Sequence, residues 1–235
     1  MKRIKPVEGN KTFCMAPWIH TYLSPQMERR LCCSSRENSK TFNQYIDLNK
    51  KSQSFSPDTL EQHWNSEYMK TIRRDLMAGK EIDQCQVCNH KLLSVSTYRT
   101  HFNTLFEDQI DEAFEKTKDD GHTDMKVTSW DYRFNNLCNF KCRMCGDMLS
   151  SSWEAEERTH NMWNPNKPSQ MWMREDIKAE IDKFHDTIII KEFERAIESK
   201  TIKEIYWCGG EPLMWKIHWE SMKRILELRY QDQVS

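Results

Sequence analysis

Three cysteines within eight residues constrain this chain more than any other feature of its sequence. Cys138, Cys142 and Cys145, called here the cysteine triplet, follow the spacing C-x3-C-x2-C. Three thiolates on one short loop can ligate three corners of a [4Fe-4S] cluster and leave one iron open to a small molecule. The alternative is a zinc site whose fourth ligand, a Cys or a His, comes from elsewhere in the chain. The spacing therefore predicts a metal centre and leaves the metal open.

The composition favours metal ligation over disulfide bonds for the nine cysteines of this chain of 235 residues. Its 35 basic and 36 acidic residues balance, so the charge indicates neither a nucleic-acid partner nor a membrane surface. No apolar run approaches the roughly 18 residues of a membrane span. Residues 1–11 also lack the apolar region of a signal peptide. We therefore expect a cytoplasmic protein, and in that reducing compartment clustered cysteines serve metals or redox chemistry.

The second half of the chain has the pattern of alternating strands and helices. Residues 126–140 are strand-like and lead into the triplet, and helical patterns follow at 174–184 and 188–199. A second strand is predicted within 201–214 and a further helix at 219–230. The order β-α-β-α predicts an α/β fold with a parallel sheet.

A Gly-Gly-Glu-Pro turn ends the second predicted strand, on the rim of the sheet that also carries the triplet. Ligands of α/β proteins bind at this rim. Gly209 and Gly210 expose backbone groups and Glu211 adds a carboxylate, so the turn can hold the ammonium group of an amino acid. Alone, these residues would indicate only a turn. Cys208, directly before them, is predicted to be a small core residue.

A C-x3-C-x2-C loop followed by Gly-Gly-Glu-Pro after the next strand resembles the radical SAM superfamily. The resemblance implies that the triplet holds a [4Fe-4S] cluster whose open iron binds S-adenosylmethionine. Reductive cleavage would then release a 5′-deoxyadenosyl radical that abstracts hydrogen from a substrate. The implied contacts to S-adenosylmethionine come from Gly209, Gly210, Glu211 and Met144, the last packing on adenine where the family often has an aromatic residue.

The first half of the chain carries a second group of cysteines. Cys14, Cys32 or Cys33, Cys85 and Cys88 supply four ligands from three segments. Four thiolates make a closed site, either for zinc or for a fully ligated [4Fe-4S] cluster, and the spacing does not separate the two.

The segments around these N-terminal cysteines resemble the twitch domain, a shortened relative of the SPASM domain. The resemblance implies an auxiliary [4Fe-4S] cluster on Cys14, Cys32, Cys85 and Cys88, with Cys33 the weaker candidate. It also implies a small α+β domain over residues 1–122 and the N-terminal part of a radical SAM (βα) barrel over 123–235.

The implied function is that of a radical SAM enzyme, or its N-terminal part, acting on a peptide or small molecule with flavodoxin or ferredoxin as electron donor. The alternatives are a non-catalytic zinc- or cluster-binding module and an inactive remnant. A complete barrel needs more βα units than the two predicted, so we expect a truncated or split gene product, or a second chain that completes the barrel. The second strand would otherwise leave an open edge.

Two local expectations concern other residues. Trp64, Ile72 and Leu76 recur at helical spacing, which predicts one helix from Pro57 to Gly79. Four basic residues near the cysteines are expected to be solvated surface groups: Arg29, Arg30, Lys141 and Arg143.

Overall fold

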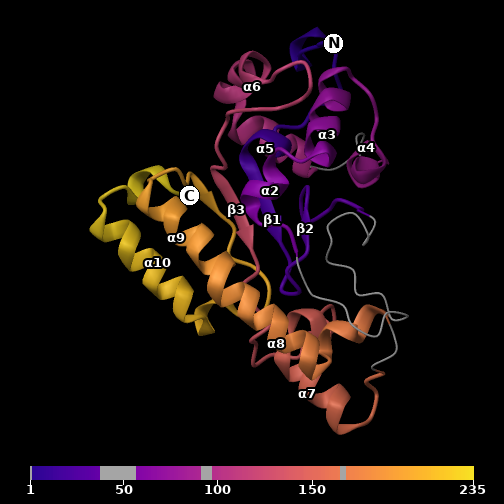
Figure 1. Cartoon of the computed structure of the whole chain (residues 1–235), viewed down its shortest axis with the longest axis vertical. Coiled ribbons are helices and arrows are strands. Elements are labelled where there is room, and N and C mark those ends of the chain that lie inside the picture. The colour runs from indigo at the N-terminus through magenta and orange to yellow at the C-terminus, as the bar shows by residue number, and fades with distance from the viewer. Residues whose placement is uncertain (1, 38–56, 91–96, 165–167) are drawn as a thin grey trace. The chain divides into compact units, whose positions relative to one another are not determined.

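The computed structural model of the chain describes residues 2–37, 57–90, 97–164 and 168–235 (Figure 1). It is a mixed α/β structure with a four-stranded sheet. The strands are β1 (His20–Leu23), β2 (Arg29–Arg30), β3 (Ser129–Tyr132) and β4 (Glu204–Ile205). The helices in the first part of the chain are α1 (Ala16–Ile19), α2 (Leu60–Trp64), α3 (Glu67–Met77), α4 (Gln86–His90), α5 (Tyr98–Leu105) and α6 (Ile110–Lys116). Those after β3 are α7 (Ser151–Thr159), α8 (Glu175–Phe184), α9 (Ile190–Glu198) and α10 (Lys216–Glu227).

The chain divides into two compact units that interleave along the sequence. Among described residues, the first unit comprises 2–22, 30–37 and 60–130, and the second comprises 23–29, 57–59 and 131–235. The boundary passes through β1 and β3, so it differs from the predicted division at residue 122. The assignment of residues 1–122 to a twitch-like domain and of 123–235 to a barrel remains a prediction.

The sheet has the strand order β2-β1-β3-β4. The N–H of Thr128 donates to the carbonyl of Ile19 (2.8 Å), and that of Arg133 donates to the carbonyl of Leu23 (3.0 Å). These bonds advance in the same direction along both segments, so β1 and β3 are parallel. The sequence predicted β3 and β4 alone as the sheet of the second half. The sheet is larger because β1, far away in the sequence, pairs with β3.

The edge of β4 is hydrogen-bonded to the last residue of the chain. Ile205 N–H donates to the carbonyl of Ser235 (3.1 Å), and Ser235 N–H donates to the carbonyl of Lys203 (2.9 Å). The expectation of an open edge at this strand is therefore wrong for the described chain. The reason is local, because the turn after α10 brings Ser235 back beside the strand.

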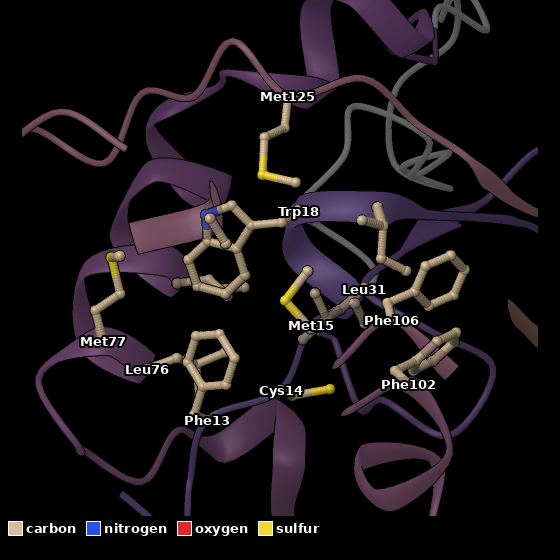
Figure 2. Packing of buried hydrophobic residues seen from close by; sticks show 14 of the residues in the cluster. Phe13, Cys14, Met15, Trp18, Leu31, Leu76, Met77, Phe102, Phe106 and Met125 are labelled. Atoms are coloured by element: carbon tan, nitrogen blue, oxygen red, sulfur yellow. The ribbon is translucent and has the colours of Figure 1, made fainter. Parts of the chain in front are cut away.

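A dense apolar core fills the first unit (Figure 2). Trp18 is fully buried and stacks on Phe13, with ring centroids 5.2 Å apart. Leu76 of α3 and Phe102 of α5 complete the same cluster. Cys14 and Cys32 belong to this core, so two of the predicted ligands are buried and do not lie on the surface.

The predicted helix from Pro57 to Gly79 is two helices in the structure. The side chain of Asn65 interrupts it by donating to the carbonyl of Thr123 (3.1 Å). Ser66 then caps α3, its Oγ accepting the N–H of Met69. The single-helix prediction is therefore wrong at its start, whereas its end just before Gly79 is confirmed.

The predicted helices of the second unit are present. α8 continues into α9 through a π-helical segment, His185–Ile189, and α9 lies beside α10 (Figure 1). Arg224 of α10 binds Glu198 of α9 through two bonds of 2.6 and 2.9 Å.

Arg29 is a buried member of the second unit, not a surface residue. Its guanidinium donates to Glu192 (2.5 Å), to the Tyr132 hydroxyl (2.7 Å) and to the carbonyl of Asp58 (2.7 Å). The side chain is 0 % exposed. The expectation of a solvated arginine is wrong because a buried carboxylate on α9, remote in sequence, neutralises it.

Within the described parts of the chain, no helix is long and apolar enough to cross a membrane.

Candidate metal centres

The cysteine triplet lies on the loop between β3 and α7, and the first turn of α7 holds that loop in place. The carbonyl of Cys138 accepts bonds from the hydroxyls of Ser151 (3.0 Å) and Ser152 (2.8 Å). The indole N–H of Trp153 donates to the carbonyl of Cys142 (3.1 Å). The backbone of the loop is therefore fixed by side chains that the sequence analysis did not single out.

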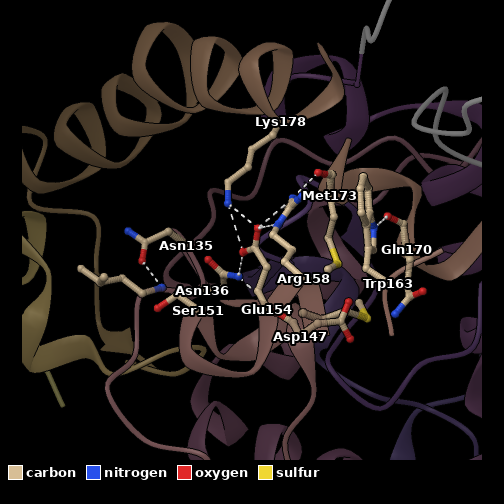
Figure 3. A network of polar contacts seen from close by, with 12 residues as sticks. Asn135, Asn136, Asp147, Ser151, Glu154, Arg158, Trp163, Gln170, Met173 and Lys178 are labelled. Carbon is tan, nitrogen blue, oxygen red and sulfur yellow. Dashed lines mark hydrogen bonds and ion pairs between the residues drawn. The ribbon is translucent and has the colours of Figure 1, made fainter. Parts of the chain in front are cut away.

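A buried carboxylate anchors α7 in turn (Figure 3). Glu154 accepts bonds from Lys178 (2.9 and 3.0 Å), Arg158 (3.1 and 3.2 Å) and Asn136 (2.9 Å). Burial raises the pKa of Glu154, but the hydrogen bonds from Lys178 and Asn136 outweigh it and the net shift is downward. Asn136 also donates to the carbonyl of Asp147 (3.0 Å), so the network clamps both ends of the triplet loop.

The Gly-Gly-Glu turn packs directly on the segment that leads into the triplet. Gly209 and Gly210 have φ values of +87° and +60°. A Cβ on Gly209 would lie 2.6 Å from the side chain of Arg133, and one on Gly210 would lie 2.6 Å from the carbonyl oxygen of Leu137. Both positions therefore require glycine. The N–H of Glu211 donates to the same carbonyl of Leu137 (2.8 Å).

The two sequence motifs thus lie against one another, since Leu137 directly precedes Cys138. The carboxylate of Glu211 accepts the N–H of Leu213 (3.2 Å) and caps the short turn Pro212–Met214. Met144 is 97 % exposed, so it is available to a ligand without any rearrangement.

The three thiols of the triplet differ in exposure, and the thiol of a fourth cysteine lies near them. Cys138 is buried, Cys142 is exposed and Cys145 is half-buried. Burial raises the pKa of Cys145, and Cys142, Cys138 and Cys208 raise it further by their charge. Cys208 therefore lies near the triplet and is only half-buried, which makes the prediction of a core residue wrong.

The N-terminal cysteines also come together from their three segments. Cys14 precedes α1, and Cys32 and Cys33 follow β2. Cys85 directly precedes α4, and Cys88 lies within that helix. Burial raises the pKa of Cys14 to about 12, with a further contribution from Cys85. The pKa of Cys32 is raised by burial and then by Cys14.

Cys32 is the more buried residue of the Cys32-Cys33 pair, and its thiol interacts with those of Cys14 and Cys85. Its backbone is held by Ser35, whose hydroxyl donates to the carbonyl of Cys32 (2.7 Å). This geometry supports the choice of Cys32 as a ligand, which remains a prediction.

In each unit the thiols lie near one another, but their side chains do not surround a single metal position. Among the described residues, no three Cys, His, Asp or Glu side chains have the arrangement that holds a metal ion.

Two residues near the N-terminal thiols escaped the sequence analysis. Arg99 of α5 is buried, and its charge acts on Cys14 and Cys85. Glu37 accepts bonds from the Leu31 N–H (2.8 Å) and the Ser35 hydroxyl (2.6 Å). Neither lies in a recognisable motif, so only the packing of the folded chain reveals them.

Comparison of the chain with protein-family models, with curated proteins and with solved structures finds no match in any of the three.

Proposed function

We propose that this chain is a radical SAM enzyme, or the N-terminal part of one, that reductively cleaves S-adenosylmethionine at a [4Fe-4S] cluster on the cysteine triplet. One observation carries the proposal: the Gly209–Glu211 turn packs on Leu137, the residue before Cys138. Two motifs about seventy residues apart therefore form one surface.

The residues present fit such a cluster. Thiolates are the ligands of [4Fe-4S] clusters, and three of them come from a single loop fixed by α7. Once bound, the cluster supplies the electron that splits the sulfonium of S-adenosylmethionine into methionine and a 5′-deoxyadenosyl radical. The protein binds and orients the reacting groups and sets the electrostatic environment around them.

Groups of the chain itself then bind the methionine end of S-adenosylmethionine. A side chain at Gly209 would clash with Arg133 and one at Gly210 with the carbonyl of Leu137, so the backbone of the turn lies against the segment that leads into the triplet. Glu211 adds a negative charge for the amino group, and Met144 offers a flexible thioether to adenine. In the first unit, Cys14, Cys32, Cys85 and Cys88 hold an auxiliary [4Fe-4S] cluster.

The remaining parts of the proposal rest on the resemblance described above. The substrate is a peptide or small molecule, the electron donor is a flavodoxin or ferredoxin, and the compartment is the cytoplasm. The resemblance also implies a second chain that completes the barrel.

A second candidate function is a non-catalytic module with zinc at both sites. Cys208 favours it, because a fourth thiol beside the triplet can close the site that radical SAM chemistry needs open. Cys208→Ala separates the two functions. In a closed zinc site, this variant loses most of its zinc affinity. In an open cluster site, it retains its iron and its reaction with S-adenosylmethionine.

The direct test is formation of 5′-deoxyadenosine by anaerobically purified protein given S-adenosylmethionine and dithionite. We expect product from the parent and none from Cys142→Ala. Because Cys142 is exposed, the alanine costs little packing, and iron at the N-terminal site stays bound. Product from Cys142→Ala, or none from a parent that carries both clusters, contradicts the proposal.

A further inference from the structure

Arg99 is a buried cation in the first unit, and no carboxylate of the described residues neutralises its charge. Its side chain belongs to α5 and the residue is only 4 % exposed. Burying a guanidinium is unfavourable unless hydrogen bonds and an anion compensate for the lost water. Among the described residues, no carboxylate forms an ion pair with it.

The hydrogen bonds of Arg99 lead to the two segments that carry the thiols. Nη1 donates to the carbonyl of Lys11 (3.0 Å), three residues before Cys14. Nη2 donates to Oδ1 of Asn89 (2.6 Å), the neighbour of Cys88. Both acceptors are neutral, so they orient the guanidinium without neutralising it.

The third donor of the guanidinium is unused. Nε is buried and finds no hydrogen-bond acceptor in the part of the chain that the structure describes. An unmade bond of a buried charged group is costly, which points to a bound group beyond what the described residues provide.

The guanidinium lies close enough to the thiols of Cys14 and Cys85 for its charge to act on both. The two acceptors that orient it also lie beside predicted ligands, one three residues before Cys14 and the other next to Cys88.

Metal binding at these thiols would place a negatively charged group beside the buried guanidinium. Four thiolates around Zn²⁺ or around an oxidised [4Fe-4S] core leave a group with a net negative charge inside the protein. A buried arginine with a spare donor is well suited to such a group, since guanidinium hydrogen bonds to anions are charge-assisted.

We propose that Arg99 is a positioning residue of the N-terminal thiol site, where it neutralises the bound thiolate–metal group and donates from its free Nε to a ligand sulfur. The proposal rests on metal loading at this site, which is part of the proposed function, and not on cleavage of S-adenosylmethionine. For a cluster, it makes Arg99 a determinant of the reduction potential, because charge and hydrogen bonds to sulfur set that potential.

The test uses the full chain with Cys142→Ala in every sample, so that the N-terminal group alone is observed. Redox titration followed by electron paramagnetic resonance compares Arg99, Arg99→Lys and Arg99→Gln. Glutamine removes the charge, so the reduced and more negative cluster is disfavoured about tenfold, which for one electron is a midpoint potential about 59 mV lower. Lysine retains the charge and recovers most of the shift.

Arg74→Gln is the matched control, because Arg74 lies in the same unit on α3 and binds the carbonyl of Asp120 (2.7 Å) at the surface. We expect no change of potential in this variant. An Arg99→Gln potential equal to that of the parent overturns the proposal. Equal shifts in the lysine and glutamine variants also overturn it, since they would indicate a packing effect.

If Arg99→Gln fails to fold, Arg99→Lys decides: we expect iron content like that of the parent and a midpoint potential less than about 59 mV below it, and a shift of that size or more contradicts the role of the charge. If the purified chain contains zinc, the proposed function fails and Arg99 is tested separately. Co²⁺ titrated into the metal-free chain then serves as the probe. We expect about tenfold weaker binding in Arg99→Gln than in the parent, and equal binding contradicts the role of Arg99.

Discussion

At the scale of single residues, the candidate site depends on positions where only one residue type fits. Gly209 and Gly210 combine positive φ with backbone and side-chain neighbours too close for a Cβ. Sequence alone identified both glycines, because a Gly-Gly pair is conspicuous in a chain with six glycines. Arg99 was missed, because nothing in its sequence neighbourhood records that its side chain reaches two cysteine segments.

Gly210→Ala tests the fit of the turn against the triplet loop. The new Cβ would lie 2.6 Å from the carbonyl oxygen of Leu137 and force the loop to move. Strain at positive φ adds about 1–3 kcal/mol, so we expect a loss of unfolding free energy in that range. Urea denaturation measures it. Gly146→Ala is the control, since no atom lies within 4 Å of its added Cβ, and equal losses in the two variants refute the packing described here.

Glu192→Gln tests the buried pair with Arg29. The ion pair is 2.5 Å long, and its side chains are 0 % and 4 % exposed. Removing one charge of such a pair leaves the other buried and uncompensated, at a cost of about 3–5 kcal/mol. Thermal and urea unfolding should show this loss. The exposed Glu194 lies on the same helix, and Glu194→Gln should be close to neutral; a similar effect of both substitutions contradicts the assignment.

At the scale of elements, α7 is the helix that holds the triplet loop in position. Its N-cap Ser150 accepts the N–H of Trp153, and the next residues bind the backbone of the triplet loop. Sequence patterns predicted the strand before the triplet and the helices α8 to α10, because apolar periodicity records which face is buried. They did not predict the break between α2 and α3. That break depends on a bond from Asn65 to Thr123, and periodicity carries no information about contacts between distant segments.

Glu154→Gln tests the anchoring of α7. The variant keeps the shape of the side chain but loses the charge that Lys178 and Arg158 neutralise. Because the folded-state pKa of Glu154 is lowered, its carboxylate stabilises the protein above the ordinary pKa of glutamate, and this contribution disappears as the pH falls through the folded value. We expect the variant to unfold more easily than the parent at neutral pH and to bind less iron at the triplet.

The same comparison at acid pH provides the control for Glu154. Parent and variant should converge in stability once the carboxylate of the parent is protonated. A difference between them that does not depend on pH would mean that the charge is not what anchors α7.

At the scale of the whole molecule, each of the two compact units gathers its own set of thiols from residues that the sequence had singled out. The sequence predicted both sets, since cysteine spacing is conspicuous. It could not predict the interleaving of the units, because β1 pairs with β3 across more than one hundred residues. Such long-range strand pairing depends on which surfaces pack together in the folded chain, so it leaves no local pattern in the sequence.

The central claim is that both sets of cysteines hold iron–sulfur clusters. The triplet cluster can then be removed by Cys142→Ala without loss of the N-terminal cluster. The decisive measurement is the iron, sulfide and zinc content of the anaerobically purified chain beside Cys142→Ala. We predict a brown protein with about eight irons and about eight sulfides per chain, falling to about four of each in the variant. A colourless protein with stoichiometric zinc and no sulfide, or a variant that loses iron from both sites, would contradict the account.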